Sequence, residues 1–417
     1  MSYSDQIPIV ERGKAGSMSR LENENHILNL SGLKFWWIIL IVFCHFFAVL
    51  KYCSPDFATL PVFLTNGHFS ACGFLVLSGF LLYLRHGMDY AQGNPVSKGI
   101  VLFLKGFLRF LLLNVATMLP YVIVDIQDGK FRLKYAIMVL MNVLYVQDWI
   151  PGKHYSLNGV AWFLSSLMFI YLVTPLLFKA YRGLRNNLGA KSVIPAIGIF
   201  AVALLGAESF FRFDFYRNPL YSLVMFAFGM VLADGAMTGC AGKAGKADKN
   251  RKGSEIGTAD ENGKEKKIGT ADENGKENKV GTDNKTEKQK QFRKTLILCL
   301  VSVVLLVLGF VYTPAKMPYL WDAALSGVII LCLYLSKDFL LFSGRFFTEL
   351  GNSSLAIMLI HYMICSLPFK WLILNYRIPP VLTISLMVGC VILSCIAAYV
   401  YDLVRKKNLY LQGRKTA

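Results

Sequence analysis

The chain has 417 residues, of which 55% are hydrophobic and only 17% are charged. The hydrophobic residues run in uninterrupted blocks of about 16 to 22 residues, the length that spans a bilayer as a helix. This pattern excludes an ordinary soluble domain, and because polar and apolar residues do not alternate it also excludes a transmembrane barrel. The formal net charge of +18 suits nucleic-acid binding or basic cytoplasmic loops, and the apolar blocks favour the loops. We therefore expect an all-α polytopic membrane protein with no nucleic-acid partner.

Ten apolar blocks are predicted to cross the lipid bilayer. They lie at 33–50, 68–84, 106–124, 159–178, 192–208, 218–234, 295–313, 319–336, 353–373 and 379–404. A shorter eleventh block, 134–147, would put every later basic loop on the outer side if it crossed, against the positive-inside rule. It is therefore predicted to be a re-entrant or peripheral segment on the outer side. Both termini are then cytoplasmic, and the first span itself is the expected insertion signal.

One polar insertion interrupts the predicted membrane domain. It contains a repeat of twelve residues, IGTADENGKEKK, which starts at Ile256, recurs at Ile268 and decays from Val280. Since one aliphatic residue per repeat cannot build a core, we expect a disordered cytoplasmic linker, with a regulatory or lipid-binding arm as the alternative. The predicted organisation is a cytoplasmic tail, a membrane domain in two parts around this linker, and a second cytoplasmic tail, at 1–30, 31–235, 236–294, 295–404 and 405–417.

The first span, Gly32 to Leu50, carries two ionisable residues in an apolar stretch, Lys34 near its start and His45 deep inside it. Eleven steps of about 100° return Lys34 and His45 to nearly the same helix face, roughly 16 Å apart along the axis. An ionisable side chain at that depth is costly and usually faces a partner or a water-filled cavity. His45 is therefore the first candidate functional residue.

The second and third spans offer further candidates. The second contains Ser78 beside Gly79, and small residues at mid-membrane either permit close helix packing or leave Ser78 to contact a substrate. At the cytoplasmic start of the third span, Lys105 and Arg109 lie four residues apart on one helix face. Such a pair either binds phosphate through charge-assisted hydrogen bonds or extends toward the lipid headgroups as ordinary boundary residues.

Two later residues complete the candidate set. Trp162 lies near the outer end of the fourth span, where it is either an interfacial aromatic residue or a substrate contact. His361 lies two turns into the ninth span, and it is either a second catalytic residue or a hydrogen-bonding partner across the bundle. The nine cysteines show neither zinc nor disulfide spacing, so no metal site is expected.

Five segments follow one another along the chain: LKFWWIILIVFCHF, CGFLVLSGFLL, AWFLSSLMFIYLVTPLL, FAFGMVLA and LGNSSLAIMLIH. Together with the ten-span layout, they resemble the acyltransferase family 3 of bacterial integral-membrane acyltransferases over residues 28–404. The resemblance implies transfer of an acyl group, commonly acetyl from acetyl-CoA, to hydroxyls of cell-surface glycans or of lipid-linked sugars. It also implies a stand-alone form without a C-terminal esterase-like domain, located in the bacterial cytoplasmic membrane.

The family pattern matches this chain unevenly. A basic residue, ten intervening residues and an essential histidine match Lys34 and His45. The family's paired arginines with two intervening residues are not reproduced, because three residues separate Lys105 from Arg109. The acid that some members carry in the fourth span is absent at 165–167.

The chemistry of the candidates fits this reaction class. The phosphates of acyl-CoA, the expected donor, arrive from the cytosol, where Lys34, Lys105 and Arg109 are predicted to lie. A histidine near mid-membrane can remove the acceptor's hydroxyl proton, so His45 is predicted to be a general base, with a transient acyl carrier as the alternative. No permanently bound cofactor is expected. The rival functions are a membrane transporter and a non-catalytic scaffold for glycan export, neither of which consumes a thioester.

Overall fold

The computed structural model describes residues 15–65, 67–86, 95–129, 132–150, 152–153, 156–210, 217–256, 273–312, 318–336 and 339–415, and this part of the chain is helical throughout with no strand. The helices are α1 (Ala15–Cys53), α2 (His68–His86), α3 (Pro95–Gln127), α4 (Leu133–Val143), α5 (Trp162–Leu188), α6 (Val193–Phe210), α7 (Pro219–Ile256), α8 (Glu273–Val311), α9 (Pro318–Leu335), α10 (Leu340–Ser343), α11 (Arg345–Asn352), α12 (Ser354–Ile364), α13 (Lys370–Asn375) and α14 (Pro380–Lys415). Short 3₁₀ turns lie at Pro55–Phe57, Val62–Thr65, Gln147–Trp149 and Gly189–Ser192, and a π-helical turn, Cys365–Phe369, joins α12 to α13.

The long helices confirm an all-α polytopic membrane protein. Nine helices in the described part are long and apolar enough to cross a membrane, and α6 occupies the place of the fifth predicted span, 192–208. Lipid offers the backbone no hydrogen-bond partners, so these apolar blocks must satisfy their own amides as helices. Helix α4 has 11 residues, about 16 Å at the helical rise, and is too short to cross. The structure thus agrees with the prediction that the block 134–147 does not span.

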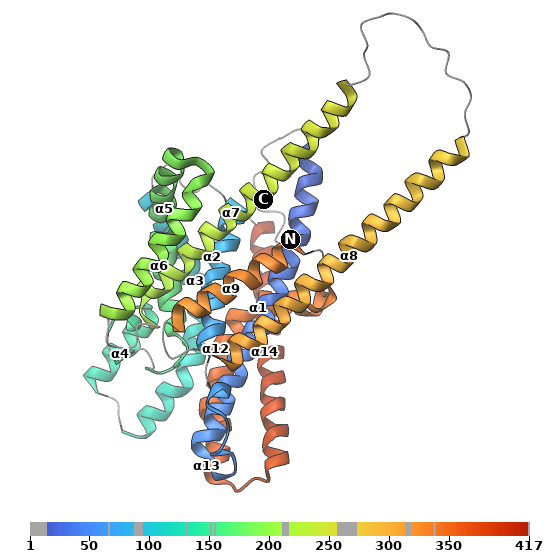
Figure 1. Ribbon diagram of the computed structural model, residues 1–417. Coiled ribbons are helices and arrows are strands. Elements are labelled where there is room, and N and C mark those ends of the chain that lie inside the picture. Colours follow the sequence, from blue (N-terminus) through green and yellow to red (C-terminus); the bar gives the residue numbers. More distant parts are fainter. Residues whose placement is uncertain are drawn as a thin grey trace, which may run out of the picture.

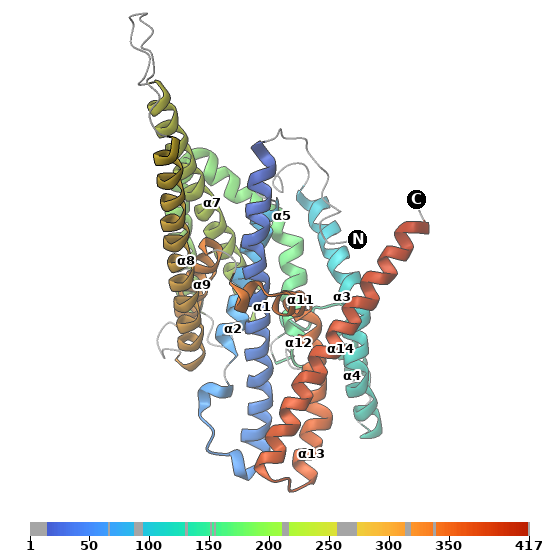
Figure 2. The ribbon, with the colours of Figure 1, turned by 90° about the vertical axis from the view of Figure 1, so that its right-hand side faces the viewer.

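Helix α1 runs the length of the bundle and contacts α2, α9, α12 and the α10–α11 corner (Figures 1 and 2). The ends of α7 and α8 that flank the insertion extend beyond the bundle on one side, where α1 begins and α14 ends (Figure 2). The 3₁₀ turns after α1, together with α13, lie at the opposite end (Figure 2). We call these two ends the insertion side and the far side.

The insertion is helical where the structure describes it. Helix α7 continues to Ile256 and α8 begins at Glu273, whereas an irregular linker is expected over 236–294. Lys, Glu and Ala in these ends have high intrinsic helix propensity, and each end is continuous with an apolar helix of the bundle. Residues 257–272 and 1–14 lie outside the described residues, and α1 and α14 extend into the predicted tails.

Glycines permit a close contact between helices α2 and α7. A Cβ placed on Gly79 would lie 1.9 Å from the carbonyl oxygen of Phe226, and one on Gly229 would lie 1.8 Å from that of Val76. Only residues without a side chain allow backbones to approach this closely. The small residues of the second span therefore serve helix packing, which is one of the two alternatives that the sequence leaves open.

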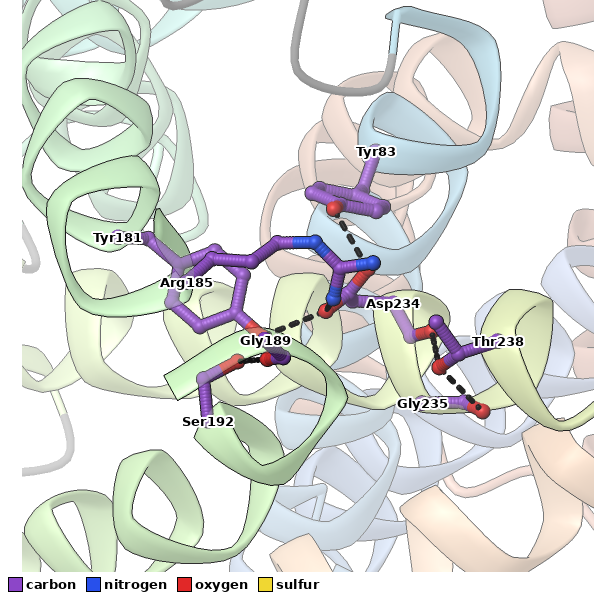
Figure 3. A network of polar contacts seen from close by, with 8 residues as sticks. All are labelled: Tyr83, Tyr181, Arg185, Gly189, Ser192, Asp234, Gly235 and Thr238. Carbon is purple, nitrogen blue, oxygen red and sulfur yellow. Dashed lines mark hydrogen bonds and ion pairs between the residues drawn. The ribbon is translucent and has the colours of Figure 1, made fainter. Parts of the chain in front are cut away.

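A buried acid ties α2, α5 and α7 together near the insertion side (Figure 3). Asp234 is 3% exposed and accepts hydrogen bonds of 2.8 Å from the hydroxyls of Tyr83 and Tyr181. Its second oxygen also forms an ion pair with Arg185. Because a buried carboxylate is costly unless it is paired and hydrogen-bonded, three helices must keep their places for this group to stay satisfied.

Candidate active site

Two histidines from opposite ends of the chain meet inside the bundle. His45 Nδ1, on α1, lies 3.1 Å from His361 Nε2, on α12. His361 is fully buried, whereas His45 is half-buried and retains accessible surface. The histidine at mid-membrane therefore faces a partner in the bundle rather than lipid. Of the two alternatives for His361, the structure shows a hydrogen bond across the bundle.

The proton positions of the pair follow from the group at its buried end. His361 Nδ1 lies 2.9 Å from the carbonyl oxygen of Ile357, and a carbonyl can only accept, so this nitrogen carries the proton. A neutral imidazole has one N–H, which makes His361 Nε2 an acceptor and His45 Nδ1 its donor. The free lone pair of the neutral pair is then on His45 Nε2. His45 is thus held in the tautomer that can remove a proton.

Tyr362 and Arg217 complete the surroundings of the pair. The ring of Tyr362 stands edge-on to His45, with ring centroids 5.2 Å apart and an interplanar angle of 87°. The charge of Arg217, in the segment before α7, acts on both of these side chains and on Asp148. Partial burial lowers the pKa of the Arg217 guanidinium, and the Asp148 carboxylate opposes that change. A positive charge therefore lies near the histidine pair.

The acid that faces Arg217 is itself held in place. Asp148 belongs to the 3₁₀ turn Gln147–Trp149, is 3% exposed, and accepts a hydrogen bond of 2.8 Å from Ser166 of α5. The fourth span supplies no acid of its own at 165–167, but it anchors one from the preceding turn. The turn at the end of the segment predicted to be peripheral thus contributes a buried carboxylate to this region.

The loop before α5 and helix α3 fasten α12 near the histidine. Asn158 Nδ2 donates to the carbonyl oxygen of Leu359 at 3.1 Å and to Thr117 Oγ1 at 3.2 Å. The Tyr121 hydroxyl donates to the carbonyl oxygen of Tyr362 at 3.2 Å and also contacts Ser366 Oγ. The residues on either side of His361 are therefore fixed by hydrogen bonds from other helices.

A π-helical turn lies directly after this fastened stretch. Pro368 lies inside the turn, and a proline ring excludes the ordinary helical bond one turn back, which favours a wider turn. Ser366 Oγ donates to the carbonyl oxygen of Tyr362 at 2.6 Å. This side-chain bond ties the start of the wider turn to α12.

Three cations gather toward the insertion side of the histidine pair. The charges of Arg85, at the end of α2, and Arg109, on α3, both act on Lys34 of α1. Within the described residues no carboxylate acts on Lys34, and Arg109 Nε is buried with no hydrogen-bond partner there. Lys105 is exposed and is not among the charges that act on Lys34. We call Lys34, Arg85 and Arg109 the cation cluster; such a cluster suits an anionic ligand.

A family model described as an acyltransferase domain matches residues 27–399, nearly the whole chain. The chain belongs to this membrane acyltransferase family, acyltransferase family 3. No curated protein and no solved structure matches the chain significantly. The reaction class is therefore acyl transfer within a membrane, and in this acyltransferase the histidine pair and the cation cluster lie at the two ends of the same stretch of α1.

The remaining predicted residues of the acyltransferase lie elsewhere. Ser78 donates its hydroxyl to the carbonyl oxygen of Phe74 at 2.7 Å, so the hydroxyl is already bonded within its own helix. Trp162 is 7% exposed and packs edge-on to Phe163, inside the bundle rather than in an exposed interfacial belt. Neither side chain is brought to the histidine pair by a contact that the structure shows.

Several residues of the site were not predicted from the sequence, although the position of some of them in the sequence is unusual. Asp148 is an acid in the apolar stretch LYVQDWI, and an acid within an apolar stretch marks a site for the same reason as His45 does. Tyr362 is the neighbour of a candidate histidine. Arg85 and Arg217 look like ordinary basic residues at helix ends, and only the fold shows what they face.

Proposed function

We propose that this acyltransferase transfers an acetyl group from acetyl-CoA to a hydroxyl of a cell-surface glycan or a lipid-linked sugar, with His45 as general base. The observation that carries the proposal is the 3.1 Å contact between His45 and the buried His361. A base must present an unprotonated nitrogen, and this pairing leaves His45 Nε2 in that state.

The transfer needs no reactant beyond His45, the acceptor hydroxyl and the thioester of acetyl-CoA. His45 Nε2 takes the proton of the acceptor hydroxyl while the hydroxyl oxygen bonds to the thioester carbon, and the carbonyl π electrons move to the carbonyl oxygen. The C–S bond next breaks as the carbonyl re-forms, and the imidazolium gives its proton to the CoA thiolate. The products are the ester and free CoA thiol, and the histidine is neutral again.

The cation cluster supports CoA as the donor. Among the described residues no carboxylate acts on Lys34, and Arg109 Nε has no hydrogen-bond partner. Such cations favour phosphate, which guanidinium groups bind through two hydrogen bonds at once. Lys34 and His45 are eleven residues apart on α1, roughly 16 Å along the helix, a separation that the extended pantetheine arm of CoA can bridge. The phosphates and the thioester thus have separate places on one helix.

The positions of the cation cluster and the histidine pair also suggest how the protein is oriented in the bacterial cytoplasmic membrane. The basic loops and both termini are placed in the cytoplasm, so the insertion side faces acyl-CoA. Arg217, whose charge acts on His45, and Asp148, whose charge acts on Arg217, come from segments predicted to lie on the outer side. The acceptor hydroxyl is therefore expected to approach His45 from the far side.

The test is acetyl transfer by native membrane vesicles supplied with radiolabelled acetyl-CoA, in which both labelled product and free CoA thiol are counted. Loss of the general base is expected to lower the rate of His45→Ala by about 10²- to 10⁴-fold. Normal transfer by His45→Ala would refute the mechanism. A transporter or a scaffold would consume no thioester at all, so wild-type vesicles that release no CoA thiol would support either rival.

Substitution within the cation cluster is expected to weaken donor binding rather than the chemical step. For Arg109→Gln we expect the KM for acetyl-CoA to rise about tenfold or more, since a hydrogen bond to a charged group contributes about 1.5 to 3 kcal/mol. The kcat should change little. Lys179→Gln, which removes an exposed cation near the insertion side, is the matched control. An unchanged KM in Arg109→Gln would exclude this residue from the donor site.

A further inference from the structure

Tyr362 presents a hydroxyl group whose position is fixed but whose hydrogen bond is unused. The hydroxyl donates to no described residue, and the side chain is half-buried, so part of its surface remains accessible beside His45. Buried or half-buried tyrosines usually give their hydroxyl a partner. An unused donor beside a catalytic base is therefore available to a substrate.

The backbone and the ring of Tyr362 are both restrained. Its carbonyl oxygen accepts from Tyr121 at 3.2 Å and from Ser366 at 2.6 Å. Its ring packs edge-on against His45. At the other end, a Cβ placed on Gly159 would lie 2.4 Å from the Tyr362 hydroxyl oxygen. Gly159 therefore has to lack a side chain for the hydroxyl to occupy this place.

The electrostatic surroundings of the hydroxyl favour negative charge on a bound group. The charge of Arg217 acts on Tyr362 as well as on His45. A guanidinium near a hydrogen-bond donor attracts an oxyanion and strengthens the donor's bond to it, the more so where water is scarce. Base, donor and positive charge are thus grouped within one small region.

We propose that Tyr362 is a catalytic residue whose hydroxyl donates a hydrogen bond to the thioester carbonyl oxygen as that oxygen becomes negative in the tetrahedral intermediate. This role rests on the proposed function, since it concerns the same acyl transfer. The step needs no further reactant: the electrons that reach the carbonyl oxygen come from the C=O bond, and they return to it when the C–S bond breaks. Tyr362 keeps its proton throughout, and Arg217 stabilises the same charge from a distance.

The test compares Tyr362→Phe with the wild type in native membrane vesicles supplied with radiolabelled acetyl-CoA, with rates normalised to the amount of protein. Phenylalanine keeps the ring against His45 and removes only the donor. We expect kcat to fall about 10²- to 10³-fold, the usual effect of removing one oxyanion donor, with the KM for acetyl-CoA close to normal. Tyr376→Phe, at an exposed tyrosine after α13, is the matched control.

A double-mutant cycle separates this role from simple packing. A methyl group on Gly159 would lie 2.4 Å from the Tyr362 hydroxyl oxygen and 2.7 and 2.9 Å from the two nearest ring atoms. Gly159→Ala therefore displaces the ring together with the hydroxyl and should also lower kcat. In the Tyr362→Phe background no donor is left to displace, so Gly159→Ala should lower kcat by a smaller factor there than in the wild type. If wild-type vesicles transfer acetyl and Tyr362→Phe does so at the same rate, the role of Tyr362 is overturned while the proposed function stands. If wild-type vesicles transfer no acetyl, both proposals are overturned.

Discussion

His361→Phe is expected to lower kcat for acyl transfer by about 10²- to 10⁴-fold, although His361 itself need not touch the substrate. Phenylalanine fills a similar volume but leaves His45 Nδ1 without an acceptor. His45 is then free to carry its proton on Nε2 instead, and in that tautomer it cannot act as a base. His361→Gln, whose side-chain oxygen can accept from His45 Nδ1, should retain more activity than His361→Phe.

The measurement combines initial rates with nitrogen NMR of histidine-labelled protein, which distinguishes protonated from unprotonated ring nitrogens. We expect His361→Phe to keep a normal KM for acetyl-CoA and to show a changed protonation pattern at His45. The matched control is His86→Phe, at an exposed histidine at the end of α2, which should stay near the wild-type kcat. Normal kcat in His361→Phe would show that the contact between the histidines does not orient the base.

Asp234→Ala is expected to cause the largest loss of stability, about 3 to 5 kcal/mol, because it leaves a partly buried arginine and two tyrosine hydroxyls without their acceptor. The Asp234 side chain is 4% exposed and that of Arg185 is 25% exposed, so water screens the pair little. Asp234→Asn keeps an oxygen acceptor but loses the charge, and it should be destabilised less than Asp234→Ala.

Thermal unfolding in detergent is the measurement for this prediction. The control is Arg345→Ala, which breaks an ion pair with Glu349 on α11 in which the arginine side chain is 91% exposed; exposed pairs contribute little, so no measurable shift is expected. If Asp234→Ala unfolds at the wild-type temperature, the contacts of Figure 3 do not hold α2, α5 and α7 together. A loss of activity without a loss of stability would instead indicate a functional role for this acid.

Much of the fold follows from the sequence because lipid permits few solutions. An apolar block long enough to cross must be a helix, so most of the spans could be placed from composition and length. That reasoning does not extend to the polar insertion, whose described ends are helical, because burial in lipid does not decide the structure of a polar segment. The short block 134–147 was assigned correctly as not spanning, but the contribution of Asp148, in the turn at its end, to the site could not be foreseen.

The sequence identified residues of the candidate site only where an ionisable residue lies deep within an apolar span. His45 and His361 stand out because ionisable groups are expensive in lipid. Lys105 and Arg109 look equivalent in sequence, yet the fold places only Arg109 among the charges that act on Lys34. Arg85 replaces Lys105 in that cluster, and nothing in its own segment distinguishes it from an ordinary boundary arginine.

The sequence by itself determined the class of protein, the spans and the helix face shared by Lys34 and His45, since these depend on composition and on the geometry of a single helix. Only the tertiary structure determined which residues contact that face. It brought His361 to His45 across 316 positions of the chain, and it placed the ring of Tyr362 edge-on to the base. Such contacts depend on how helices pack, which is set by distant residues such as Gly79 and Gly229 rather than by the helix that carries the chemistry.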